Sequence, residues 1–433
     1  MTTNLIIQKL KIGERLTAQQ IREFFRKREE WDEDYSLPLA RRALEIGENF
    51  LAYDIAEHIS NDTLIGKIHV MALALARSGA LKRASDLVAQ LPDNDDSEVV
   101  GLKSRILKDL ATRSTDVEKQ KEYYERAGHL SLEIFNRKHQ YYNGINAASC
   151  LLMAGHEAEA RQLVREQVLP VCCAEDLHDL WWHATMGECH LLLKEYSLAG
   201  KYYHDAVQMA ISEGKFGNLT STLKQLHLLA KHFDKTAIEK LLEQMALPSV
   251  AVFSGHMMDR PGRKVPRFPA YAEEQVRSEL AAVIRKHRIH IAFVSCACGG
   301  DILFAEEVLK YGGECFMFPS LPMESEIRNS VDFIPGSNWK ERLEALLLND
   351  NTTLIPPECD VIEDESDAIV YDFNNRYMLG SAISKSKELL LPLVGVAVWN
   401  REKSGLTGGT DSAVERWLAS GLSVEIVTPE VKK

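Results

Sequence analysis

Apolar residues recur every three to four positions through the first 245 residues of the chain. Prolines are few in this half, whereas Ala, Leu, Glu and Lys are frequent. This spacing places the apolar side chains on one face of each successive α-helix. The pattern therefore predicts an all-α domain over residues 1–245.

Near Pro248 the pattern changes to short apolar runs that alternate with amphipathic segments. The runs are typical of buried strands and lie at 249–256, 289–296, 314–320, 352–357, 389–399 and 423–429. Strands that alternate with helices form a parallel sheet whose two faces are both covered. Residues 246–433 are therefore predicted to form one α/β domain of Rossmann-like architecture.

Short segments that end in alanine recur within the helical half. They are GENFLA (47–52), GALKRA (79–84), EYYERA (122–127), GHEAEA (155–160) and KEYSLA (194–199). Their closing alanines are spaced near the 34-residue period of tetratricopeptide repeats. In such a repeat the Gly or polar residue forms a turn, and the small alanine lets two antiparallel helices approach. A generic helical bundle is the alternative, but five copies favour an α-solenoid.

Residues 141–228 resemble the TRAFs-binding, repeat-type regulatory region of the apoptosis-signal-regulating kinases and their bacterial relatives. The segment Asn143–Asn146 and the residues Trp182, Ala184 and Thr185 carry this resemblance. The chain has neither the Gly-rich loop nor the HRD and DFG motifs of a kinase. The resemblance therefore implies a scaffold whose helical repeats bind a protein partner, and we also expect a homo-oligomer.

Composition and charge exclude several other classes of protein. A net charge of −12 argues against broad nucleic-acid binding, which needs a basic surface. No apolar run is long enough to cross a membrane, and the N-terminal segment lacks the pattern of a signal peptide. The eight cysteines have the spacing of neither a zinc site nor a disulfide framework. We therefore expect a cytoplasmic protein with reduced thiols, no metal, and no nucleic-acid or membrane partner.

Two glycine turns lead directly into predicted helices at the ends of predicted strands. Gly299, Gly300 and Asp301 follow the strand at 289–296, and Gly408, Gly409, Thr410 and Asp411 follow the strand at 389–399. Ligands bind beyond the carboxyl ends of parallel strands, and helix N-termini favour phosphate. A tight turn explains either glycine pair alone, but the two together predict a phosphate-bearing ligand.

Other polar residues at this edge of the sheet are predicted to contact the same ligand. They are Ser254, Gly255, His256, Arg260, Arg267, Ser295, Glu324, Asn375 and Arg376. The basic loop 259–267 is expected to close over the anion, because arginine pairs well with phosphate. Each of these features also has a purely structural interpretation. Residues 259–267 would then be an exposed basic loop and His256 a structural histidine. Asp301 and Asp411 would cap their helices, and Glu324 and Glu326 would lie at a solvated helix start.

Three segments of the second half resemble the SLOG superfamily. They are SGH (254–256), the segment SCACGGDILFAEEVL that begins at Ser295, and GGTD (408–411). SLOG domains are Rossmann-like and related to the cytokinin-activating phosphoribohydrolases and to the fold of DNA-processing protein A. The resemblance implies that the domain binds a nucleotide or nucleotide-derived messenger, in bacterial defence or stress signalling.

The hydrolase relatives suggest an enzymatic alternative, a nucleotide N-glycosidase that uses Glu415 or Asp411. Those relatives carry P-G-G-x-G-T-x-x-E, whose Glu acts with an Arg on the ribose–base bond. Here Thr407 replaces the proline, a glycine is missing, and Glu415 lies two residues too late. Two residues rotate a helical side chain by about 200°. Ligand sensing is therefore the prediction, and a scaffold without any ligand is the third alternative.

Overall fold

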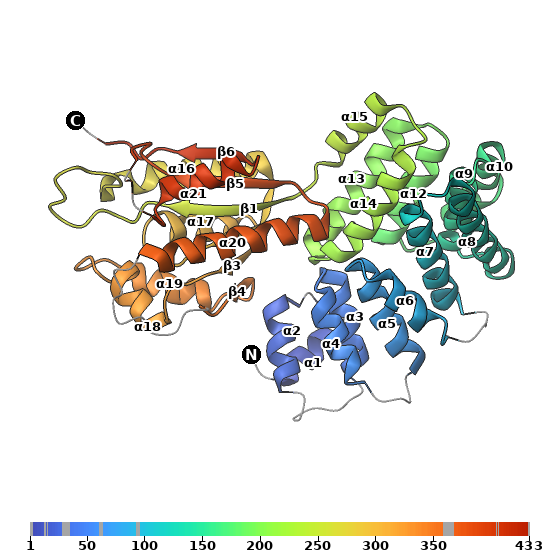
Figure 1. Cartoon of the computed structure of the whole chain (residues 1–433), viewed down its shortest axis with the longest axis horizontal. Coiled ribbons are helices and arrows are strands. Elements are labelled where there is room, and N and C mark those ends of the chain that lie inside the picture. Colours follow the sequence, from blue (N-terminus) through green and yellow to red (C-terminus); the bar gives the residue numbers. More distant parts are fainter. Residues whose placement is uncertain are drawn as a thin grey trace. The chain divides into compact units, whose positions relative to one another are not determined.

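The computed structural model describes residues 3–12, 14, 16–27, 35–59, 64–91, 96–357, 368–403, 405 and 407–431. The chain divides into two compact units, Met1–Leu247 and Pro248–Lys433, and each has its own hydrophobic core. The first unit is helical and the second is an α/β unit with a six-stranded parallel sheet (Figure 1). Within the described residues, no helix has both the length and the apolar character needed to cross a membrane.

The first unit consists of successive antiparallel helices. The longer ones are α1 (Thr3–Ile12), α2 (Ala18–Arg26), α3 (Ser36–Ile46), α4 (Asn49–Glu57), α5 (Leu64–Arg77), α6 (Leu81–Val88), α7 (Ser97–Arg113), α8 (Val117–Lys138), α9 (Tyr141–Met153), α10 (Glu157–Leu163), α12 (Leu180–Leu192), α13 (Tyr196–Glu213), α14 (Phe216–Ala230) and α15 (Lys235–Met245). A π-helical turn, η4 (Val164–Val168), and the short α11 (Leu169–Cys173) follow α10.

The predicted repeat alanines lie at the helix–helix contacts of this unit. All five are fully buried, and they fall on the second helix of successive pairs: Ala52, Ala84, Ala127, Ala160 and Ala199 on α4, α6, α8, α10 and α13. A larger side chain at such a position would force the paired helices apart. The predicted tetratricopeptide-like architecture is thus confirmed.

The turns before these alanines follow the prediction in four of the five copies. Gly47, Gly79 and Gly155 have positive φ angles of 89°, 90° and 94°, which glycine adopts without strain, and Lys194 also has a positive φ. The copy EYYERA is different, because residues 122–127 lie inside α8 and no turn occurs there. Helix α8 begins earlier, after the N-cap residue Asp116. The predicted turn at residues 122–127 is therefore wrong, and the turn lies before Val117 instead.

The last long helices return to the first repeat. Helix α14 packs against α3, although about 170 residues separate them in sequence. A Cβ atom on Gly217 would lie only 2.1 Å from the carbonyl oxygen of Leu44 and 2.6 Å from the nitrogen of Gly47. The absence of a side chain at Gly217 therefore permits this contact. The repeats of the predicted solenoid consequently close into a ring.

The second unit contains a parallel sheet with the strand order β4-β3-β2-β1-β5-β6. The strands are β1 (Ser249–Gly255), β2 (Ile289–Val294), β3 (Glu314–Met317), β4 (Thr352–Leu354), β5 (Leu393–Val398) and β6 (Ser423–Val427). The helices are α16 (Glu273–His287), α17 (Gly300–Lys310), α18 (Met323–Glu326), α19 (Trp339–Leu347), α20 (Ala368–Leu389) and α21 (Thr410–Ala419), with a 3-10 turn, η5 (Ala270–Ala272), and a π-helical turn, η6 (Ile327–Val331). All six predicted strands are confirmed.

Helices cover both faces of this sheet. Ala251 and Phe253 of β1 share one core cluster with the apolar side chains of α16, α17 and α19. The opposite face is covered by α20 and α21, where Trp417 packs against Gly395 of β5. Strand β1 pairs with β2 on one side and with β5 on the other. The strand order therefore reverses direction between β1 and β5, which is the switch point where doubly wound sheets bind ligands.

Candidate functional site

A histidine and an asparagine lie at the carboxyl ends of the two switch-point strands. His256 follows β1, and its backbone N–H donates to the Val398 carbonyl at the end of β5, 2.9 Å away. The Nε2 of His256 lies 2.9 Å from the Oδ1 of Asn400. This Oδ1 also accepts the backbone N–H of Glu402, which identifies it as the oxygen of the amide. His256 therefore donates through Nε2 and has Nδ1 as its acceptor nitrogen.

His256 is held in its neutral form by its surroundings. Its side chain is buried, and burial lowers the pKa of the imidazole. The hydrogen bond to Asn400 raises the pKa, and the charges of Arg267 and Arg263 lower it. Burial and two nearby cations disfavour a further positive charge here. At neutral pH the imidazole is thus a polar, uncharged group beside two guanidinium groups.

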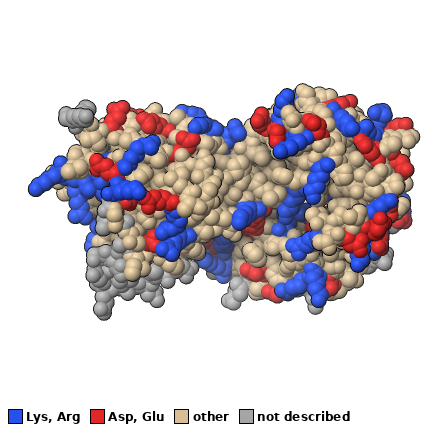
Figure 2. All heavy atoms as spheres, turned by 45° about the horizontal axis from the view of Figure 1, so that its top comes forward, with Lys and Arg blue, Asp and Glu red and all other residues tan. Residues whose placement is uncertain are grey.

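The basic loop after β1 is closed at its base by Asp259. The Oδ2 of Asp259 accepts the backbone N–H groups of Arg267 and Phe268 at 2.8 and 2.9 Å. Phe268 and Met258 are buried in the core, so both ends of the loop are anchored, while the tip 260–265 is exposed. Figure 2 shows the basic side chains gathered at this end of the α/β unit. The loop therefore presents cations on a fixed base.

The cations of this loop point in two directions. The charges of Arg267 and Arg263 both lower the pKa of His256, and the charge of Asp411 on α21 raises the pKa of Arg267. The exposed Arg263 pairs through Nε with the Oδ1 of Asp259, 3.3 Å away. Burial lowers the pKa of Arg267, as expected for a guanidinium with little access to water. Arg260, in contrast, lies 4.7 Å over the ring of Phe333. Of the two predicted arginine contacts, Arg267 lies at the site, whereas Arg260 is engaged in a cation–π contact.

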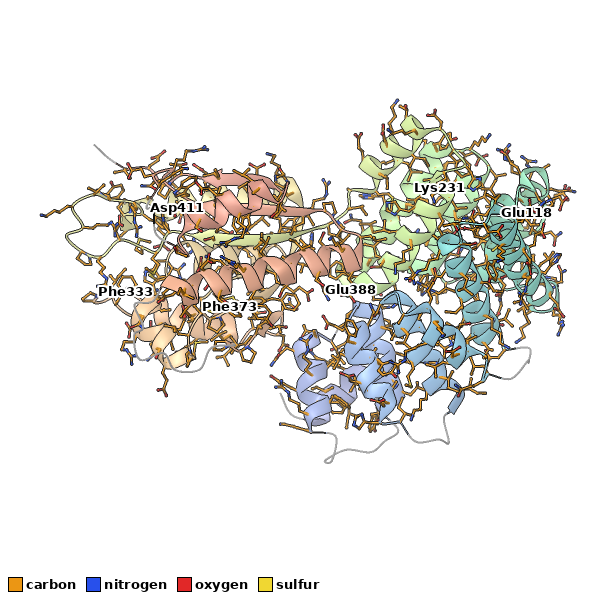
Figure 3. The ribbon with its side chains drawn as sticks, viewed as in Figure 1. Glu118, Lys231, Phe333, Phe373, Glu388 and Asp411 are labelled. Carbon is orange, nitrogen blue, oxygen red and sulfur yellow. The ribbon has the colours of Figure 1, made fainter. Side chains whose placement is uncertain are left out.

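The start of α21 forms the other side of the site. Gly408 has a φ of 85°, Gly409 is the N-cap, and Thr410 and Asp411 are buried in the first turn. Asn375 of α20 donates from Nδ2 to the Gly408 carbonyl, 3.0 Å away, so this predicted residue supports the turn. Figure 3 shows Asp411 at the beginning of α21. The Oδ2 of Asp411 accepts the backbone N–H of Gly405 at 3.2 Å, so Asp411 orders the preceding loop and is not the helix cap.

At the other glycine turn, Gly299–Gly300, the backbone of residues 255–258 packs directly against the glycines. The N–H of Gly300 donates to the His256 carbonyl at 3.1 Å. A Cβ on Gly299, whose φ is 87°, would lie 2.6 Å from the Met258 nitrogen, and one on Gly300 would lie 3.0 Å from the Gly255 Cα. These glycines let the α17 start pack against the end of β1. The structural alternative, a tight turn, therefore explains Gly255, Gly299 and Gly300.

Asp301 lies beneath the same turn. Like Asp411, it accepts a hydrogen bond from the loop before its helix and does not cap that helix, α17. Its Oδ2 accepts the N–H of Ala297 at 3.2 Å, and Gly299 is the N-cap. Asp301 is 4% exposed, and burial raises the pKa of its carboxyl to about 7. The nearby charge of Glu326 raises it further. Asp301 is therefore an interior group that orders the turn before α17. The neighbouring Cys296 and Cys298 are also buried.

The remaining predicted residues lie around this edge in structural roles. Ser295 donates to the Phe318 carbonyl at 3.1 Å, and Ser254 is half-buried at the end of β1. Arg376 pairs with Asp372 at 2.7 Å, as does Arg416 of α21, which ties α20 to α21. Glu324 is exposed. Its neighbour Glu326 is buried and accepts the N–H groups of residues 320 and 321, so the expectation of a solvated Glu326 is wrong.

Glu415, the catalytic candidate, lies apart from these groups. Its Oε1 pairs with the Nζ of Lys403 at 2.5 Å, and more than half of the Glu415 side chain is exposed. A carboxylate that acts on a glycosidic bond needs a partly dehydrated position next to the ligand. The geometry of Glu415 does not favour the enzymatic alternative.

Two residues of the site were not singled out from the sequence. Asn400 follows β5 immediately, so the rule that polar residues at strand ends mark the site would have found it. Asp259 was predicted only as one residue of the basic loop 259–267. Its role depends on the hydrogen bonds that it accepts from the backbone of residues 267 and 268, which no local sequence pattern indicates. Both belong to the switch-point site.

Comparison with known proteins concerns the helical unit. The family model described as Tetratricopeptide Repeats-Sensor matches residues 50–151. No curated protein matches this chain. Among solved structures, the chain is similar to a thermophilic TPR protein of Thermus thermophilus, with 18% identity over 48% of this chain and 100% of that chain. The TM-score is 0.35, which does not establish a common overall shape.

Proposed function

We propose that the α/β unit binds a nucleotide or nucleotide-derived messenger at the switch point between β1 and β5. The helical repeats would then transmit ligand occupancy to a protein partner, through a change in oligomeric state or in the partner surface. The match to a sensor-type repeat family supports a signalling role. The SLOG resemblance favours bacterial defence or stress signalling. The ligand, the partner and the homo-oligomer are parts of this proposal.

The observation that carries the proposal is the half-buried Arg267, anchored by Asp259, at the edge where His256, Asn400 and the α21 start lie. A guanidinium with reduced access to water binds an oxyanion more strongly than an exposed one does. Phosphate oxygens would lie between Arg267 and the first turn of α21. The neutral His256 and the carboxylate of Asp411 would then face the polar groups of a sugar or base, because a carboxylate accepts hydrogen bonds from hydroxyls.

Isothermal titration calorimetry of the full chain with a panel of mono-, di- and cyclic nucleotides tests this function. The variant Arg267→Ala removes the half-buried cation and is expected to weaken binding by about 10- to 100-fold, the usual effect of losing a hydrogen bond to a charged group. The matched control is Arg285→Ala, because Arg285 is exposed in the last turn of α16, near the opposite end of the sheet.

Equal affinities for Arg267→Ala and for Arg285→Ala would contradict the proposed site. Absence of heat with every nucleotide of the panel would favour the scaffold without a ligand. Release of free base from AMP or NAD, followed by chromatography, would instead support the glycosidase. A loss of that release in Glu415→Gln would then identify Glu415 as its catalytic residue.

A further inference from the structure

The closed ring of the helical unit surrounds a cavity of about 740 Å³. Its wall is built by α3, α5, α7, α9, α12 and α14, the first helices of the successive pairs and the closing helix. Pockets of this volume are typical of small-molecule sites. The wall is mixed: Leu44, Leu102 and Ile145 are apolar, while Tyr142 and Trp181 are aromatic. The cavity exists only because α14 closes the ring onto α3.

Three cations converge on α14 at this wall. Nη2 of Arg77 and Nη1 of Arg105 both donate to the Oγ of Ser221, at 3.0 and 3.3 Å. Lys108 is 8% exposed and donates to the side-chain oxygens of Asn146 and Gln225, at 2.7 and 3.2 Å. Two guanidinium groups thus share Ser221 as an acceptor, Arg77 also donates through Nη1 to the Leu44 carbonyl at 2.6 Å, and the ammonium is bound by amides. Like charges held together in a protein interior repel one another unless an anion lies between them.

The carboxylates of the wall balance these cations only weakly. Glu98 pairs with Arg41 at 3.0 Å, and Glu45 pairs with Arg42 at 2.7 Å. Asp109 lies 3.9 Å from the Nε of Arg105, the limit of an ion pair, and Glu175 also lines the wall. Burial raises the pKa of the Glu188 carboxyl, whose Oε1 accepts hydrogen bonds from the side chains of Ser149 and Gln225. The wall as a whole holds five carboxylates and five Lys or Arg side chains, so the positive charge is clustered around Ser221 rather than in surplus over the whole cavity.

Several buried polar atoms of the same wall lack hydrogen-bond partners among the described residues. They include the Nδ1 of His69, the Nε of Arg105, whose nearest carboxylate is 3.9 Å away, and the Oγ1 of Thr222, which neighbours Ser221 on α14. Thr222 is only 7% exposed and lines the cavity. Buried donors and acceptors of a folded protein are normally paired. Unmet polar atoms next to clustered cations indicate that the cavity is built for a ligand.

We propose that this cavity binds a small molecule through a phosphate or carboxylate group held by Arg77, Arg105 and Lys108. The anionic group lies against Ser221, and the body of the ligand contacts the apolar and aromatic wall. This site is separate from the one at the switch point of the α/β unit. The helical unit would thus sense a ligand of its own, and binding would stabilise the closure of α14 onto α3.

The test places a carboxylate where the anion is proposed to lie. In the full chain, Ser221→Asp should raise the unfolding midpoint of the helical unit, because the new carboxylate neutralises the two guanidinium groups. Pyrophosphate and citrate, the two probes, should slow amide hydrogen exchange in residues 97–113 and 216–230 of the unmodified chain, relative to sodium chloride at equal ionic strength. Ser221→Asp should lower the affinity for the effective probe at least about tenfold.

Ser212→Asp is the matched control, because Ser212 is exposed on α13 and adds the same charge away from the cavity wall. It should leave the probe's effect unchanged. Protection by pyrophosphate alone supports a phosphate ligand, and protection by citrate alone supports a carboxylate. A lower midpoint in Ser221→Asp overturns the proposal, since the positive charge would then already be neutralised within the chain. Protection by neither probe, or protection that persists in Ser221→Asp, also overturns it.

Discussion

The pH dependence of the α/β unit offers a quantitative test of how Asp301 is held. Asp301 is 4% exposed beneath the turn that joins β2 to α17, and burial raises the pKa of its carboxyl to about 7. In an unfolded chain an aspartate has a pKa of about 3.9. Between these two values the folded state retains a proton that the unfolded state has released. The folded state is therefore favoured at low pH, and this advantage disappears as the pH rises.

The size of the effect follows from the difference between the two pKa values. Three pKa units correspond to about 4 kcal/mol of unfolding free energy, at about 1.4 kcal/mol per unit. Roughly 2–3 kcal/mol of this should be lost between pH 5 and pH 8, with little change above pH 8. The variant Asp301→Asn cannot titrate, so this loss should vanish. The variant should be less stable than the unmodified chain at pH 5, because an amide replaces one acceptor of the backbone N–H groups.

Urea denaturation of both proteins at pH 5, 6, 7 and 8 measures these curves, and hydrogen exchange of β2 and α17 assigns the transition to the α/β unit. Other buried groups also titrate in this range, since burial lowers the pKa of His256 and raises that of Glu326. The contribution of His256 cancels in the difference between Asp301→Asn and the unmodified chain, whereas that of Glu326, whose charge acts on Asp301, cancels only in part. Parallel curves for the two proteins would refute the reasoning, because Asp301 would then titrate equally in both states.

Two further predictions concern the closed ring and the switch point. Gly217→Ala should destabilise the helical unit by about 1–3 kcal/mol, because its Cβ would collide with the backbone of residues 44–47; an unchanged urea midpoint would contradict the closure of α14 onto α3. Asn400→Ala removes the acceptor of the His256 Nε2 proton, so the pKa of His256, already lowered by burial, should fall further. NMR titration of the imidazole measures this, and a pKa equal to or above that of the unmodified chain would be the opposite of the expected result.

The sequence predicted the elements of both units, because each element must bury one face. The repeat alanines were found because only a small side chain fits where two helices touch, and all five are fully buried. The strands were found because a strand covered on both faces is apolar throughout its length. The EYYERA copy misplaced a turn, since a long helix contains the same spacing of alanine and polar residues as a turn between two helices.

The candidate site could be predicted only in outline. Polar residues at strand ends indicated the correct edge of the sheet, and Arg267 and Asp411 act on each other there. Sequence could not show that the backbone of residues 256–258 fills the turn at Gly299, or that Glu326 rather than Glu324 is buried. These outcomes depend on which segment packs against the turn and on where the short α18 passes into the π-helical η6.

What the sequence by itself determined is the kind of each element and the edge of the sheet where chemistry is expected. Local periodicity carries this information, because neighbouring residues share one helix or one strand. The tertiary structure alone decided that β1 lies between β2 and β5, and that α14 closes onto α3. The switch-point site and the cavity of the ring follow from those two contacts. The pairing of β1 with β5 and the contact of α14 with α3 each join residues more than a hundred positions apart, whose proximity depends on packing of the whole unit rather than on any local pattern.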